Sequence, residues 1–176
     1  KNLEVINIYM MLTVQLIYYF LRQLVGKAQM TGGILTKLYI MKEQLKTIQI
    51  IHLALTLGVA FAYYFLSDLS SFNDLFTLPE INSSTIYIAI IPMIAFISGN
   101  LMFKNMLGKI DKKLKVEDNF GAYQTASLVR WTILEGTAFL IIMTNTDFIL
   151  FGVVLIIYLA LLRPSESIIQ KDLKNL

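Results

Sequence analysis

Gly121–Met143, with the sequence GAYQTASLVRWTILEGTAFLIIM, is the stretch that decides the fold of this chain. It is long and apolar enough to cross a bilayer as one helix, because about 20 apolar residues span roughly 30 Å of hydrocarbon. Arg130 and Glu135 nevertheless lie well inside it. Ionisable side chains at such a depth are costly, so they are usually paired, held in the protein interior or functional. We therefore interpret this segment as the helix around which the other segments are organised.

The composition places the chain among integral membrane proteins. Of its 176 residues 56% are hydrophobic and only 15% are charged, and the mean hydropathy is +0.65. Soluble domains are about 45–50% apolar and about one quarter charged. The chain has no cysteine, which excludes disulfides, thiolate metal sites and thiol catalysis. It has a single histidine. We expect no metal and no cofactor, and the net charge of +3 is too small to predict binding to nucleic acid.

The hydrophobic segments predict an all-α bundle with four membrane spans. These spans are Ile48–Leu66, Ile86–Phe103, Gly121–Met143 and the shorter Phe148–Leu162, and they form a domain of residues 41–176. Val5–Leu21 is at the lower limit of length for a fifth span. Residues 1–40 are either this extra helix with its linker or an extension foreign to the native protein, because the sequence MKEQLK from Met41 looks like an ordinary bacterial start.

The distribution of charge predicts how the bundle is oriented. Every lysine and arginine apart from Arg130 lies before the first of the four spans, between the second and third, or after the fourth, and Lys1 precedes the possible fifth span. By the positive-inside rule, both the beginning and the end of the four-helix unit are then cytoplasmic. Tyr63 and Tyr64, at the far end of the first span, lie where an aromatic belt is expected.

Four polar side chains are candidates for a functional cluster. Helical side chains lean toward the N-terminus of their helix, so Arg130 extends toward the level of His52 and Asn100. Glu135 cannot reach water alone, and it lies about 140° around the helix from Arg130. Its partners are therefore expected on other helices. A buried carboxylate near an imidazole is suited to carry protons or a coupling ion.

A structural interpretation of the same residues stays open. Arg130 and Glu135 would then belong to a satisfied interhelical ion pair or network that sets the register of the bundle, and His52 would be a neutral imidazole near the interface. The candidate partners of Glu135 are His52, Asn100 and the Arg130 of a second subunit. Asn100 is of a type that often connects membrane helices by hydrogen bonds.

Small residues predict where helices approach closely. Ala54, Gly58 and Ala62 follow one another at four-residue intervals in the first span. Such a stripe allows a second helix to approach the backbone. We expect Gly99 and Gly136 to serve helix packing in the same way.

Two segments resemble a family of small, uncharacterised bacterial membrane proteins with four helices, common in Bacteroidota. They are Leu45–Leu55, LKTIQIIHLAL, and Tyr123–Gly136, YQTASLVRWTILEG, and the Arg163–Ser165 region also fits. The resemblance extends from about Met41 to the end. It implies the four-helix fold and no established activity. Some members are labelled as proton-translocating rotor subunits, but this chain lacks the glycine-rich helix by which rotor subunits pack into a ring.

These observations lead to two expectations about function. The first is a non-enzymatic protein of the bacterial inner membrane with an ion- or proton-linked role centred on Glu135, assisted by Arg130 and His52. The second is a structural or assembly subunit of a membrane complex. The sequence contains no phosphate-binding loop, nucleophile elbow or metal-ligand cluster that would favour an enzyme. Expected partners are the lipid bilayer and either further copies of the chain or other membrane subunits.

Overall fold

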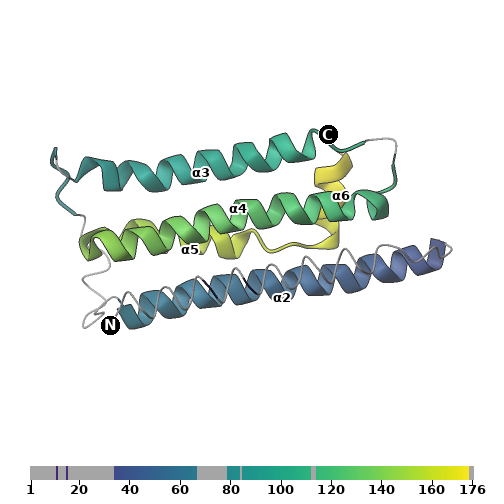
Figure 1. The fold of residues 1–176 in the computed structure, drawn as a ribbon, viewed down its shortest axis with the longest axis horizontal. Helices are drawn as coiled ribbons and strands as arrows, with labels where there is room; N and C mark the ends of the chain where they lie inside the picture. The colour runs from purple at the N-terminus through teal and green to yellow at the C-terminus, as the bar shows by residue number, and fades with distance from the viewer. Residues whose placement is uncertain are drawn as a thin grey trace.

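The computed structural model describes residues 11, 15, 34–66, 79–83, 85–111 and 114–174. Every regular element within these residues is helical, and Figure 1 shows the long helices lying side by side. The elements are α2 (Ile34–Leu66), α3 (Ile86–Leu107), α4 (Val116–Thr144), the single 3-10 turn η2 (Thr146–Phe148), α5 (Ile149–Leu161) and α6 (Glu166–Lys174). The predicted all-α helical bundle is therefore confirmed.

α4 is the central helix of the bundle. It packs against α2, α3, α5 and α6, and in Figure 1 it lies between α2 and α3. Its buried residues extend from Asn119 near its start to Ile142 near its end. The helix predicted to organise the chain is the one that every other described helix contacts.

Successive long helices are antiparallel. Phe103, near the end of α3, packs edge-on against Tyr123, near the start of α4, with ring centroids 5.7 Å apart. His52, in the middle of α2, lies 2.8 Å from the backbone oxygen of Leu159 near the end of α5. The starts of α2 and α4, the end of α3, and α6 consequently gather at one end of the bundle, and α5 runs toward this end but stops nearer the middle (Figure 1).

We call this end the basic end, because exposed cationic side chains collect there. They are Lys42, Lys46, Lys104, Lys109, Lys115, Arg163 and Lys171. The described residues at the opposite end include Glu80 and Asp147 and no lysine or arginine. The fold thus separates charge along the bundle axis as the sequence predicted.

Three described helices are long and apolar enough to cross a membrane: Met41–Leu66 of α2, then α3 and α4. The fourth predicted span corresponds to α5, which has only 13 residues, or about 20 Å of helix. After α5 the chain bends by 89° into α6. The structure supports a bundle with three full-length spans. The prediction of four such spans is not supported for the last segment, because α5 alone is too short.

Two predictions concern the N-terminal part of the chain. Val5–Leu21, the possible fifth span, lies outside the described residues apart from Met11 and Gln15. α2 begins at Ile34 and runs without a break through residues 40 and 41, where the sequence analysis places the start of the four-helix unit. That boundary is therefore not marked by a break in the helix.

The chain after Arg163 contains a further helix, α6, which the sequence analysis did not predict. The Ser165 hydroxyl accepts a hydrogen bond from the backbone N–H of Ile168 at 3.3 Å, which caps the start of the helix. Ile169 is buried against the bundle, and Leu173 packs beside it. A serine cap followed by apolar residues at helical spacing was the signal in the sequence for this element.

Tyr63 joins three helices at the end of the bundle opposite the basic end. Its hydroxyl donates a hydrogen bond to the backbone oxygen of Ala138 on α4 at 2.6 Å. It also lies directly over Gly152 on α5, where a Cβ would overlap the hydroxyl. Tyr63 is 4% exposed, whereas its neighbour Tyr64 is 68% exposed. The predicted aromatic belt is therefore wrong for Tyr63, which belongs to the core.

We expect Gly152→Ala to destabilise the bundle. The added methyl group would displace the Tyr63 ring and break its buried hydrogen bond, which is the kind of overpacking that typically costs about 1–3 kcal/mol. Thermal unfolding in detergent measures the change. Gly121→Ala is the matched control, because a Cβ there meets nothing within 4 Å. An unchanged unfolding midpoint for Gly152→Ala would show that this junction tolerates rearrangement.

Candidate functional site

Arg130 is held by a hydrogen-bonded chain that connects three helices. Its Nη2 atom donates to the hydroxyl of Tyr158 on α5 at 2.6 Å. That hydroxyl in turn donates to Oδ1 of Asn100 on α3 at 3.0 Å. The Asn100 amide donates to the backbone oxygen of Phe96, one turn earlier, at 2.7 Å. The predicted proximity of Arg130 and Asn100 is present, and a tyrosine bridges them.

Aromatic rings complete the surroundings of the guanidinium group. Its central carbon lies 5.0 Å from the ring centroid of Phe103 and 5.6 Å from that of Tyr158. Cation–π attraction at such distances contributes about 0.5–2 kcal/mol. The positive charge of Arg130 is therefore stabilised by rings and a hydroxyl group, and the carboxylate of Asp172 on α6 adds an electrostatic attraction.

Sequence reasoning missed Tyr158. The residue lies in an otherwise apolar segment, ILFGVVLIIYLAL, which reads as a plain hydrophobic helix. Its position as the only polar side chain of that helix was the available signal, because a buried tyrosine hydroxyl usually finds a hydrogen-bond partner.

His52 lies apart from the Arg130 network, on the side of α2 that faces α4 and α5. Its Nε2 atom is 2.8 Å from the backbone oxygen of Leu159. Because a carbonyl can only accept, the neutral ring carries its proton on Nε2. The imidazole also packs edge-on against Trp131, with ring centroids 4.7 Å apart. His52 therefore contacts α4 one turn before Glu135.

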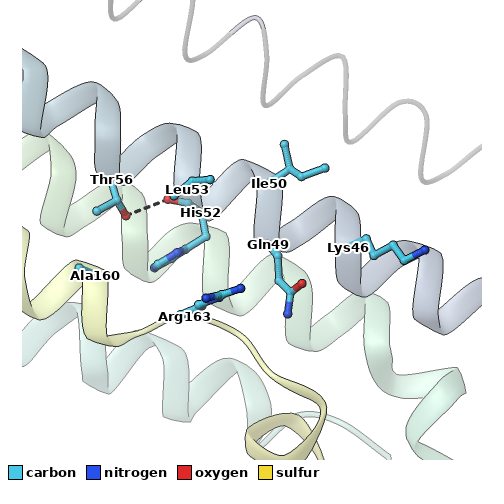
Figure 2. Close-up of a pocket in the computed structure, with 8 residues that line it drawn as sticks. All are labelled: Lys46, Gln49, Ile50, His52, Leu53, Thr56, Ala160 and Arg163. Carbon is cyan, nitrogen blue, oxygen red and sulfur yellow. Dashed lines mark hydrogen bonds between the residues drawn. The ribbon is translucent and has the colours of Figure 1, made fainter.

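A cavity of about 430 Å³ opens beside His52 near the basic end (Figure 2). It is bounded by α2 on one side and by the end of α5 on the other. The lining residues are Lys46, Gln49, Ile50, His52, Leu53, Thr56, Ala160 and Arg163. In Figure 2 the Arg163 side chain extends beneath His52 and Gln49. The Gln49 amide donates to the backbone oxygen of Pro164 at 2.9 Å, which ties α2 to the chain after α5.

Glu135 is buried without a partner. It is 5% exposed, and its Oε1 atom finds no hydrogen-bond partner among the described residues. Trp131, one turn earlier, contacts His52, and Ala138, one turn later, accepts the hydrogen bond from Tyr63. Since residues three and four apart share a helix face, Glu135 lies on the side of α4 that packs against α2.

The predicted polar cluster is thus divided into two parts. Arg130 and Asn100 belong to the network with Tyr158, whereas His52 and Glu135 lie on the α2 side of α4. Arg130 and Glu135 form no ion pair with each other within the described chain, and the interhelical pair or network of the structural interpretation, which can involve a second subunit, stays a prediction. Gln124, on the same face of α4 as Glu135, also has a buried and unpaired amide nitrogen.

The small residues predicted for helix packing occupy different environments. A Cβ at Gly99 would lie 3.7 Å from Arg130 Cγ, so α3 and α4 approach closely there. Gly58 is buried, Ala62 is half-buried and Ala54 is exposed. A Cβ at Gly136 would meet no described atom within 4 Å. Gly136 therefore faces outward from the described bundle.

No model of a known protein family matches this chain, and neither a curated protein nor a solved structure matches it. The resemblance to small bacterial four-helix membrane proteins therefore stays a prediction.

We expect Tyr158→Phe to loosen the contact between α3, α4 and α5. The substitution keeps the ring but removes the hydroxyl, which leaves Arg130 and Asn100 without this partner. Buried polar groups that lose a partner cost about 1–3 kcal/mol. Thermal unfolding in detergent measures the loss, and Tyr87→Phe on the exposed face of α3 is the control. Equal stability of both variants would contradict a structural role for this network.

Proposed function

We propose that this chain is a small polytopic protein of the bacterial cytoplasmic membrane that binds and releases protons at Glu135. Three helices of spanning length support the location. Large apolar side chains such as Ile90, Met93 and Ile97 point outward from α3, as lipid-facing residues do and as water-exposed residues rarely do in such number. The basic end would face the cytoplasm by the positive-inside rule.

The observation that carries the proposal is the unpaired carboxyl group of Glu135. An ionised carboxylate costs several kcal/mol in an apolar interior unless it is paired or hydrogen-bonded. Arg130, the nearest cation in sequence, donates to Tyr158 instead. Glu135 is therefore best accommodated in its neutral form and would ionise when its surroundings change, which is the behaviour of a proton-carrying site.

A route to Glu135 runs from the basic end through the His52 cavity. His52 lines the cavity and contacts Trp131, which precedes Glu135 by one turn, or about 6 Å along α4. Gln124 adds an unpaired buried amide on the same face, closer to the basic end. Unpaired buried polar atoms are where ordered water binds. We infer that protons reach Glu135 from this side through His52 and bound water.

The test is proton flux into vesicles that contain the purified protein. We expect wild-type protein to carry protons under an imposed membrane potential and Glu135→Gln to abolish the flux, because an amide cannot release a proton. Glu117→Gln, at the start of the same helix, is the matched control and should behave as wild type. A pH-sensitive dye inside the vesicles measures the flux. If Glu135→Gln carried protons like wild type at all pH values, the proposal would be wrong.

A second candidate function is that of a non-catalytic subunit in a membrane assembly. One face of α4 favours it, because Thr125, Thr132 and Gly136 are exposed there at helical spacing. Small residues in such a row allow another helix to approach closely in a membrane. In that case Glu135 and Arg130 would fix the orientation of α4, so that this face stays exposed to the partner helix.

Disulfide crosslinking tests this second candidate directly, since the chain has no cysteine of its own. If a second copy packs on this face, Gly136→Cys should form a covalent dimer in native membranes, because a disulfide requires Cα atoms within about 7 Å. Ser127→Cys, buried on the opposite side of α4, is the control and should not crosslink. A crosslink to a different protein would identify another subunit, and no crosslink at Gly136 would count against the assembly role.

A further inference from the structure

The cavity beside His52 has a charged part and an apolar part. Two cationic residues, Lys46 and Arg163, line it toward the basic end, while Ile50, Leu53 and Ala160 line it with apolar surface. Figure 2 shows these residues around the opening, with Arg163 reaching under α2. Proton access explains why His52 lines the cavity. It does not explain why the cationic residues Lys46 and Arg163 line it as well.

The Arg163 guanidinium is available for a ligand. It forms no hydrogen bond and no ion pair with any described residue. The ammonium group of Lys46 lies 3.1 Å from Glu43 Oε1, but its side chain is 70% exposed, so this pair is weak and easily exchanged. A guanidinium group presents a planar pair of donors that matches phosphate, and a lysine adds a mobile point charge. Together they favour an anionic group with several oxygen atoms.

The apolar part indicates what the anion is attached to. Ile50 and Leu53 are 62% and 56% exposed on the outer surface of α2. Leu53 lies seven residues beyond Lys46, or about 10 Å farther from the basic end. A ligand that follows α2 from Lys46 to Leu53 therefore passes from a cationic to an apolar environment. This order matches a phospholipid whose headgroup lies at the membrane surface and whose acyl chain points into the bilayer.

We propose that this cavity binds an anionic phospholipid, with its phosphate held by Lys46 and Arg163 and an acyl chain lying along Ile50 and Leu53. A volume of about 430 Å³ accommodates a headgroup and the start of a chain. The proposal rests on the membrane location proposed above, and it does not depend on proton transport. The lipid would lie against His52 at the entrance to the route toward Glu135.

Lipid binding to the purified full-length protein in an uncharged detergent tests the proposal. We expect native mass spectrometry to detect retained phosphatidylglycerol and little phosphatidylcholine. The double variant Lys46→Gln/Arg163→Gln should bind phosphatidylglycerol at least about tenfold more weakly, since each lost charge-assisted hydrogen bond corresponds to roughly that factor. Lys104→Gln/Lys171→Gln removes two charges from the same end outside the cavity and should bind like wild type.

Two further results decide between the possible sources of phosphate. If inorganic phosphate or glycerol phosphate displaces phosphatidylglycerol at comparable concentrations, the cavity binds a soluble phosphate compound and the lipid proposal is overturned. Equal phosphatidylglycerol binding by the cavity variant and the control variant also overturns it. The binding assay requires no proton flux. Lipid binding can therefore fail while Glu135→Gln abolishes the flux, and lipid can bind while Glu135→Gln carries protons like wild type, so the two proposals fail separately.

Discussion

The bundle depends on how α4 carries two ionisable side chains through an apolar environment. Arg130 and Glu135 lie five residues apart and therefore point in different directions, about 140° around the helix. Each must be accommodated by different neighbours. Arg130 is accommodated on the side of α3 and α5 by Tyr158, Asn100 and two aromatic rings. Glu135 is enclosed on the side of α2 without such partners.

Helix contacts near the opposite end fix the geometry around Glu135. Tyr63 spans from α2 across Gly152 of α5 to the backbone of α4, so these three helices cannot slide past one another without breaking a buried hydrogen bond. The His52 contacts with Leu159 and Trp131 join the same three helices nearer the basic end. Glu135 lies between these two junctions. Its enclosure is therefore a consequence of rigid packing on either side, which leaves the carboxyl group without a counter-charge among the described residues.

The sequence was informative wherever a property depends on composition or helical phase. It predicted the helical class, the central role of the Gly121–Met143 segment and the separation of Arg130 from Glu135. It also predicted that cationic residues gather at one end. These features follow from hydrophobic runs and from the 3.6-residue repeat, and both can be read without knowing how the helices pack.

Features that depend on which helices meet could not be read in the same way. Tyr63 looked like an interfacial residue because its position along the helix is suitable for a belt, yet its burial depends on Gly152 lying opposite on α5. Tyr158 looked like one more residue of an apolar helix. His52, Asn100, Arg130 and Glu135 were grouped by depth alone, and depth does not distinguish the two sides of α4. The α6 helix was missed because a short amphipathic helix is stabilised by the surface on which it packs.

The division of the two charges has a consequence for what the chain can do. If Arg130 were paired with Glu135, the carboxylate would be held in its ionised form, and the pair would be a fixed structural element. Because Tyr158 and Asn100 hold the Arg130 side chain on the other side of α4, Glu135 has no permanent counter-charge among the described residues. A carboxyl group of this kind responds to whatever approaches it, whether a proton arriving by way of His52 or a side chain of another subunit. The arginine network thus leaves Glu135 without a fixed charge partner in the described chain, which is the condition that the proposed proton exchange requires.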